Sequence, residues 1–139
     1  SAEALKIAQE NATKLGADVR FLADDVLQGV PQLGNEQFDI IVSNPPYIPI
    51  SEREAMHINV TNFEPSMALF VEDSDPLIFY REITRIAKSR LSDRGALLFE
   101  IHELLAEETV QMLQKEGFEA ELRHDFLNKP RMICCHKRE

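Results

Sequence analysis

The order of apolar and polar positions predicts helices that alternate with strands along the chain. Apolar residues that recur every three or four positions indicate helices, whereas short, mostly apolar runs indicate strands. The expected helices cover residues 3–15, the stretch that begins at Asp75 and Pro76 and runs to Leu91, and the stretch from Leu105 to Gly117. The expected strands cover residues 19–23, 38–42, 96–101, 118–122 and 131–135. This alternation favours an α/β fold with a mostly parallel sheet.

Three local features refine the expected fold. The strand at residues 38–42 is mostly apolar, as in strands that are buried on both faces of a sheet. Asp75 is expected to cap the helix that follows it, with Pro76 in the first turn. The last two strands are joined only by residues 125–130, which leave no room for a crossover helix, so this pair is predicted to be antiparallel.

Two stretches lack any helical or strand period. Residues 28–37 contain Gly29, Pro31 and Gly34 and are expected to form a loop that leads into the strand at 38–42. Residues 48–74 predict a long loop with a short helix near residues 51–58, and loops of this length in compact domains often carry function. Gly95 is expected to end the connection before the strand at 96–101.

Composition and charge narrow the classes of function. A chain of 139 residues with 44% hydrophobic residues predicts one globular domain. The net charge of −9, from 15 Lys and Arg against 24 Asp and Glu, argues against a broad positively charged surface that binds nucleic acid. No apolar run is long enough to span a membrane, and the first residues do not resemble a secretory signal.

The cysteines and histidines indicate neither a disulfide framework nor a metal site. Cys134 and Cys135 are adjacent and cannot easily join distant parts of the chain, so a reducing, cytoplasmic location is expected. The four histidines share no metal-ligand spacing, and no metal site is expected. Glu100, His102 and Glu103 are interpreted as the polar end of a strand rather than as acid–base groups.

The tetrapeptide Asn44-Pro45-Pro46-Tyr47 is the strongest candidate for chemistry. It follows an apolar strand directly, and the carboxyl ends of strands are where open α/β sheets place their ligands. Asn44 can both donate and accept hydrogen bonds, whereas the two prolines have no N–H group. The turn therefore presents carbonyl acceptors, with the flat face of Tyr47 beside them.

Such a turn suits the transfer of a methyl group to a planar nitrogen. Acceptors on the two hydrogens of an –NH₂ group push electron density back onto the nitrogen and fix the line of attack. The proton can leave after the methyl group has been transferred, so no strong general base is required first. An ordinary Asn-Pro turn is the alternative interpretation, and the preceding apolar strand favours the functional one.

The segment Asp39-Ile-Ile-Val-Ser-Asn-Pro-Pro-Tyr-Ile48 resembles motif IV of S-adenosylmethionine-dependent methyltransferases that modify amino or amide nitrogens. Later segments are similar to the N5-glutamine methyltransferases of peptide-chain release factors, the HemK/PrmC-like family. These segments are Asn62-Phe63-Glu64-Pro65, Ala68-Leu69, Phe79-Tyr80-Arg81, Gly95-Ala-Leu-Leu-Phe-Glu100, and Gly117-Phe118 with Asp125 and Arg131. The resemblance covers nearly the whole chain.

The resemblance implies roles for six residues. The Asn44 side chain and backbone groups of Pro45 and Pro46 would hold the glutamine side-chain amide, and Tyr47 would pack against it. Asn44 would also touch the methionine part of the cofactor, S-adenosyl-L-methionine. Asp25 and Val26 would lie at the strand end that meets the adenine ring. The protein substrate implied is a peptide-chain release factor, methylated in its Gly-Gly-Gln motif, with no direct contact to nucleic acid or membrane.

The resemblance also implies parts that this sequence lacks. The family has two earlier strands and a Gly-rich loop around the cofactor, and no two of the five glycines here are close enough to build that loop. We therefore expect residues 1–139 to be a partial catalytic domain: a Rossmann-like methyltransferase sheet truncated at its N-terminal side, with an antiparallel last strand. Alone it is expected to bind the cofactor weakly or not at all, to be inactive, and to self-associate through an exposed strand edge.

Two other functions remain open from the sequence alone. The Asn-Pro-Pro-Tyr motif is shared with adenine-amino nucleic-acid methyltransferases, although the acidic balance and Phe63-Glu64-Pro65 argue against that activity. The second alternative is a stable fragment that dimerises and catalyses nothing by itself.

Overall fold

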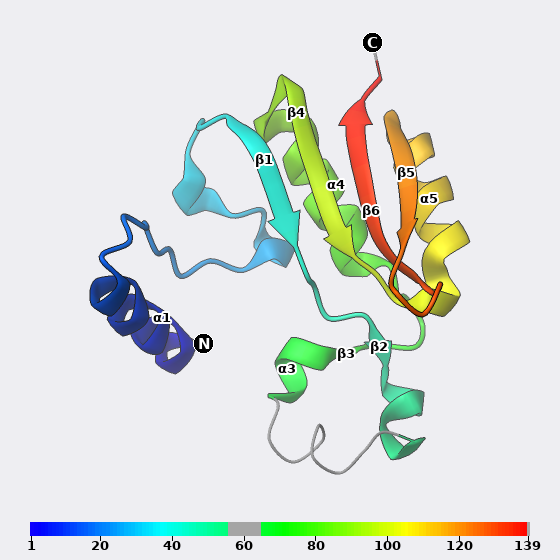
Figure 1. Ribbon diagram of the computed structural model, residues 1–139, viewed down its shortest axis with the longest axis horizontal. Coiled ribbons are helices and arrows are strands. Elements are labelled where there is room, and N and C mark those ends of the chain that lie inside the picture. The colour runs from blue at the N-terminus through cyan, green and yellow to red at the C-terminus, as the bar shows by residue number, and fades with distance from the viewer. Residues whose placement is uncertain (56–64, 139) are drawn as a thin grey trace. The chain divides into compact units, whose positions relative to one another are not determined.

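The computed structural model describes residues 1–55 and 65–138 and divides into two compact units, Ser1–Gly34 and Asn35–Glu139. The first unit holds helix α1 (Ala2–Leu15), as the apolar spacing predicts (Figure 1). Ser1 caps its start, where Oγ accepts the N–H of Ala4 at 3.4 Å. Gly16 ends it in a left-handed conformation (φ 62°) that a residue with a Cβ adopts at a cost.

The predicted strand at residues 19–23 is wrong. Residues 17–25 are irregular, and two 3₁₀ turns follow, Val26–Gln28 and Pro31–Leu33. A strand requires a neighbour to complete its hydrogen bonds, and the first unit contains no other extended segment in the structure. Residues 19–23 take part in no sheet of the described residues.

The second unit is built on a four-stranded sheet in the order β1-β4-β6-β5. Its strands are β1 (Phe38–Ser43), β4 (Leu91–Glu100), β5 (Phe118–His124) and β6 (Pro130–Lys137). Strand β1 runs parallel to β4, whereas β6 runs antiparallel to both of its neighbours. The prediction of a largely parallel sheet with an antiparallel last strand is thus confirmed.

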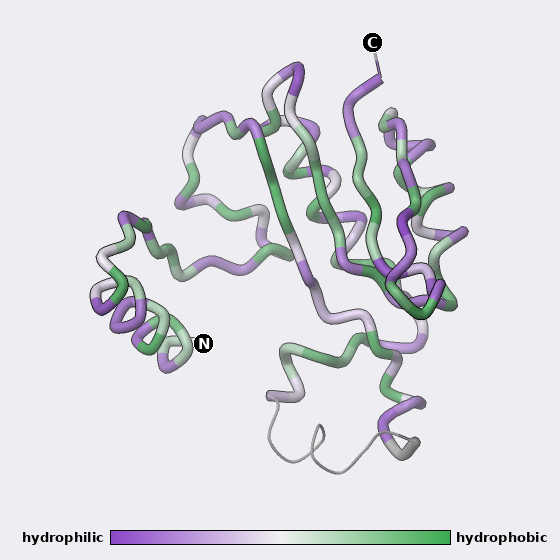
Figure 2. Tube along the Cα trace, viewed as in Figure 1, coloured by the Kyte–Doolittle hydropathy of each residue, from purple (hydrophilic) through white to green (hydrophobic). Residues whose placement is uncertain are grey.

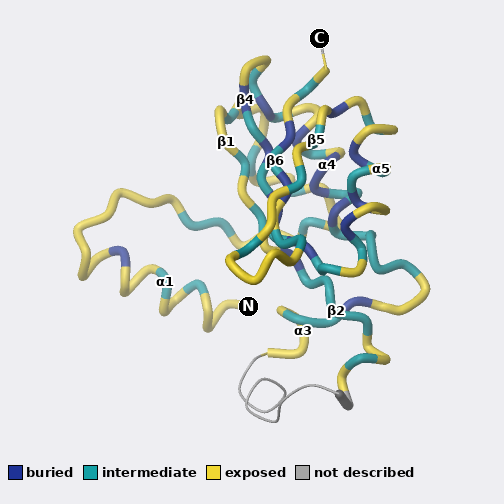
Figure 3. Tube along the Cα trace, turned by 45° about the vertical axis from the view of Figure 1, so that its right-hand side comes forward, coloured by how far each residue is buried: buried dark blue, intermediate teal, exposed yellow. Residues whose placement is uncertain are grey.

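Helices α4 (Ile78–Arg90) and α5 (Ala106–Lys115) cover one face of this sheet (Figure 1). Figure 2 shows β1 and β4 as largely apolar strands, and in β4 buried positions alternate with less buried ones from Gly95 to Glu100. Figure 3 shows the buried positions gathered on α4, α5 and the strands they cover. The largest fully buried side chains are Tyr80, Phe99, Phe118, Leu91, Leu97, Ile101, Leu113 and Ile133.

The expectation that residues 38–42 are buried on both faces is wrong in this structure. Ile40 and Val42 on β1 are 63% and 72% exposed. β1 is an edge strand, and no helix of the second unit covers this face of the sheet among the described residues (Figure 1). An apolar edge strand invites pairing with another chain, and self-association of this protein stays a prediction.

Two boundaries of elements also differ from those expected. Helix α4 begins at Ile78, and Asp75 does not cap it with its side chain, which instead forms an ion pair with Arg81. Strand β4 begins at Leu91, so Gly95 lies inside it at a register shift opposite β1. A Cβ at Gly95 would lie 2.7 Å from Cγ of Leu91 and 3.0 Å from the carbonyl oxygen of Asp39, so a larger residue would not fit.

The long segment after Tyr47 contains more structure than a loop. Strands β2 (Ile48–Pro49) and β3 (Phe70–Val71) form a small parallel sheet, with a 3₁₀ helix at Ile50–Ala55 and the short helix α3 (Ser66–Leu69) between them. The 3₁₀ helix overlaps the first part of the helix expected near residues 51–58. Residues 56–58, like Asn62, Phe63 and Glu64 of the family motif, lie outside the described residues.

Within the described part of the chain, no helix is both long and apolar enough to cross a membrane. Nor do three His, Cys, Asp or Glu side chains gather there as a set of metal ligands.

The adjacent cysteines should differ in reactivity. Cys135 is fully buried and its thiol donates to the carbonyl of Leu97 at 3.2 Å, whereas Cys134 is half-buried. Burial raises the pKa of the Cys135 thiol to about 12, and only the thiolate is nucleophilic. With a disulfide reagent at pH 8, we expect one fast-reacting thiol in the native protein and two after unfolding in guanidinium. Fast reaction of the native Cys134→Ser variant would contradict this assignment.

Candidate active site

The Asn44–Tyr47 tetrapeptide lies at the carboxyl end of the sheet, as predicted. Ser43 is the last residue of β1 and stands in register with Phe99 near the end of the parallel strand β4. Residues 44–47 then leave the sheet without regular structure. Asn44 is exposed, Pro45 is buried, and Pro46 and Tyr47 are half-buried. The polar side chain at 44 is therefore open to a ligand, while Pro45 fixes the loop to the protein.

A cavity of about 290 Å³, here called the Asn44 cavity, opens beside this loop. Asn44 and Glu100 provide polar groups at the ends of β1 and β4, and most of the remaining lining is apolar, including Leu98, Met132 and Ile133. A largely apolar hollow with a few convergent polar groups is the usual form of a small-molecule site.

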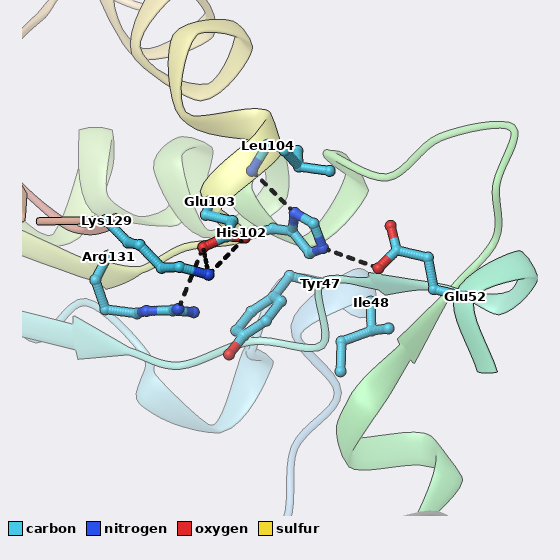
Figure 4. Close-up of a pocket in the computed structure, with 8 residues that line it drawn as sticks. All are labelled: Tyr47, Ile48, Glu52, His102, Glu103, Leu104, Lys129 and Arg131. Carbon is cyan, nitrogen blue, oxygen red and sulfur yellow. Dashed lines mark hydrogen bonds and ion pairs between the residues drawn. The ribbon is translucent and has the colours of Figure 1, made fainter. Parts of the chain in front are cut away.

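A second cavity of about 320 Å³, the Tyr47 cavity, is lined by Tyr47 and Ile48 among other residues (Figure 4). Its lining is much more charged. Glu52 and His102 lie at one end, and Glu103, Lys129 and Arg131 at the other (Figure 4). Two cavities of different chemistry thus adjoin the tetrapeptide.

Tyr47 is held in place by contacts with the end of β4 and the segment after it. Its hydroxyl donates to Oε1 of Glu100 at 2.9 Å, and its ring meets the edge of the His102 ring at a centroid distance of 6.0 Å. Burial first, and then the hydrogen bond and negative charge of Glu100, raise the pKa of Tyr47, while the nearby Arg131 acts in the opposite direction. The hydroxyl is therefore a donor at neutral pH.

The tautomer of a neutral His102 follows from its two partners. Nδ1 accepts the N–H of Leu104 at 3.1 Å, so the ring proton is carried by Nε2. Nε2 then donates to Oε2 of Glu52 at 3.2 Å (Figure 4). This contact links the segment after β4 to the 3₁₀ helix that follows β2.

Charges at the opposite end of the Tyr47 cavity compensate one another. Nζ of Lys129 lies 2.9 Å from Oε2 of Glu103, and the Arg131 guanidinium lies 3.8 Å from the same oxygen. The hydrogen bond from Lys129 lowers the pKa of Glu103. Nε of Arg131 also lies 3.6 Å from Oδ2 of Asp125. This ion-pair network joins the turn between β5 and β6 to the wall of the cavity.

The structure brings together only part of the predicted site. Asn44, Pro45, Pro46 and Tyr47 lie together, beside Glu100. Asp25 and Val26 belong to the first unit, so their contact with the cofactor stays a prediction. In the structure Oδ1 of Asp25 caps a 3₁₀ turn by accepting the N–H of Leu27 at 2.9 Å.

The part of the candidate site at and after the end of β4 differs from what the sequence pattern indicates. The sequence indicates a plain polar strand end at Glu100, His102 and Glu103. In the structure Glu100 lines the Asn44 cavity, and His102 and Glu103 line the Tyr47 cavity. The signal was available in the sequence: the strands at 38–42 and 96–101 were both predicted, and the carboxyl ends of adjacent parallel strands meet at one edge of the sheet.

The chain is similar to known methyltransferases in sequence and in fold. A family model described as "Methyltransferase small domain" matches residues 1–63. The release factor glutamine methyltransferase of Flavobacterium psychrophilum is 46% identical over 134 residues, which cover 96% of this chain and 46% of that protein. That of Bacteroides thetaiotaomicron is 37% identical over 138 residues, which cover 99% of this chain and 49% of that protein.

A solved structure confirms the fold class. The ribosomal protein L11 methylase of Lactobacillus delbrueckii subsp. bulgaricus matches the whole chain and 55% of its own length, with a TM-score of 0.63 at 19% identity. This chain spans about half the length of the curated relatives that it matches. The family resemblance indicated by the Asn-Pro-Pro-Tyr motif and the segments after it is therefore confirmed: over nearly its whole length, the chain is similar to about half of a release factor glutamine methyltransferase.

Proposed function

We propose that this chain carries the amide-binding part of an S-adenosylmethionine-dependent methyltransferase catalytic domain. Its substrate is the side-chain nitrogen of glutamine in the Gly-Gly-Gln motif of a peptide-chain release factor. One observation carries the proposal: Asn44-Pro45-Pro46-Tyr47 stands at the carboxyl end of β1, beside a cavity. The relatives of this chain are named release factor glutamine methyltransferases.

The tetrapeptide acts by holding and orienting the substrate amide. The Asn44 side chain and the carbonyls around Pro45 and Pro46 accept the two hydrogens of the –NH₂ group, and Tyr47 packs on its flat face. These acceptors restore electron density to a nitrogen whose lone pair is otherwise delocalised, and they hold it in the line of attack. The amide proton leaves after the new bond has formed, so the site needs no strong base before the transfer.

S-adenosylmethionine supplies the methyl group when it is bound. The Asn44 end of the site suits the polar amino-acid end of such a cofactor, because the exposed Asn44 amide offers both donors and an acceptor beside the Asn44 cavity. We assign Asp25 and Val26 to the adenine end by resemblance, with the Asp25 carboxylate as an acceptor for the adenine amine. The assignment rests on the match of these two positions to the family pattern. It uses no contact between the two units.

A direct assay separates this function from adenine methylation, which the same tetrapeptide could serve. The longest gene product that contains this sequence is incubated with S-adenosylmethionine and either a Gly-Gly-Gln peptide, a Gly-Gly-Asn peptide or adenine-containing DNA. We expect one added methyl group on the glutamine side chain, located by fragmentation in the mass spectrometer, and none on the other two substrates. Methylated DNA with an unmodified peptide would replace the proposal with the adenine alternative.

A further inference from the structure

Glu100 lines one of the two cavities and contacts a residue that lines the other. Its side chain borders the Asn44 cavity, while its Oε1 atom accepts the hydroxyl of Tyr47, which lines the Tyr47 cavity. The two residues are 53 positions apart in the sequence and meet because β1 and β4 end side by side.

The main chain at Glu100 is itself fixed from two sides. Tyr80, fully buried on α4, donates its hydroxyl to the Glu100 carbonyl at 3.1 Å and packs edge-on against Phe99 at a centroid distance of 5.2 Å. On the other side, the N–H of Ile101 donates to the carbonyl of Arg131 at 2.9 Å. The main chain that carries the Glu100 side chain is therefore fixed to the core of the second unit.

The loop needs such an anchor because of its composition. Pro45 and Pro46 have no N–H group, so the main chain of the loop has few donors with which to bind the rest of the protein. Beside the buried Pro45, the side-chain contacts of Tyr47 therefore help to hold the loop, and the Arg131 guanidinium also lies near the Tyr47 hydroxyl.

We propose that Glu100 is a positioning residue, whose carboxylate fixes the Tyr47 ring where it packs against the amide to be methylated. The identity of that amide rests on the function proposed above, whereas the contact between Glu100 and Tyr47 does not. Misplacing a group that orients the substrate by about 1 Å can slow a reaction by up to about a hundredfold.

The contact can be measured in this chain without any enzymatic activity. The sequence has two tyrosines and no tryptophan, so labelling with ¹³Cζ-tyrosine gives one signal for Tyr47 and one for Tyr80, assigned with Tyr47→Phe. Besides burial, Glu100 and Arg131 act on the titration of Tyr47. In Glu100→Gln we expect the pKa of Tyr47 to fall while Tyr80 still titrates at higher pH. A Tyr47 titration curve identical to that of the unmodified chain would overturn the proposal.

Kinetics of the longest gene product that contains this sequence, with the Gly-Gly-Gln peptide as substrate, test the consequence for the reaction. We expect Glu100→Ala to lower kcat by roughly ten- to a hundredfold with a smaller change in KM. Glu100→Gln should recover most of the rate, because its Oε1 atom still accepts the Tyr47 hydroxyl. The exposed Glu119→Ala on β5 is the matched control and should behave as the unmodified protein.

The two measurements separate the two proposals. Equal rates for Glu100→Ala and the unmodified protein would overturn the positioning role even if the glutamine is methylated. If no variant methylates the peptide, the proposed function fails, and the tyrosine titration still decides whether Glu100 holds Tyr47.

Discussion

Replacing Asn44 with alanine is expected to reduce glutamine methylation by at least about a hundredfold, which is the scale for loss of one preorganised polar group in an active site. The variant removes the only side-chain amide of the tetrapeptide, and with it one acceptor for the substrate –NH₂ group. Asn44 is exposed and lies after the end of β1, so the free energy of unfolding should change by no more than about 0.5 kcal/mol.

The measurement is the rate at which the longest gene product that contains this sequence methylates a Gly-Gly-Gln peptide, together with urea unfolding of the same variant. Asn35→Ala is a suitable control, because Asn35 is also an exposed asparagine of the second unit. Its Oδ1 atom accepts a hydrogen bond from the Arg90 guanidinium at 3.2 Å. We expect the control to keep its rate. Turnover that survives in Asn44→Ala would remove Asn44 from the mechanism.

The parts of the fold that depend on local pattern could be predicted from the sequence. Helix α1 follows from its apolar spacing and from Gly16, and the antiparallel pairing of β5 with β6 follows from the short turn between them. The position of the candidate site followed in the same way, since Asn44 comes directly after an apolar strand. Each of these features is decided by neighbours along the chain.

The features that the sequence did not predict depend on contacts with residues distant in the sequence. Residues 19–23 have the composition of a strand, but a strand forms only where a neighbour completes its hydrogen bonds. The exposure of Ile40 and Val42 depends on which helices cover the sheet, and the register shift at Gly95 depends on the close approach of Asp39. The contact between Tyr47 and Glu100 likewise requires knowing that β1 lies next to β4.

The largest loss of stability is expected from Phe118→Ala, at about 3–5 kcal/mol. Phe118 is the first residue of β5 and is 0% exposed. Alanine would leave a cavity between the sheet and the helices that cover it, because closely packed surroundings relax only in part. Phe126 offers a matched control: it is the same residue type, lies in the turn that follows β5, and is 96% exposed.

Urea unfolding of the two variants at one protein concentration measures the difference. For Phe126→Ala we expect a change within about 0.5 kcal/mol, as for most surface substitutions. Equal losses in both variants would contradict the packing described here, because an exposed side chain has no contacts to lose within one chain. A loss at Phe126 that grows with protein concentration would have a different cause, because only contact between chains depends on concentration. The same pair of variants therefore tests the core of the second unit and shows whether the exposed Phe126 takes part in a contact between chains.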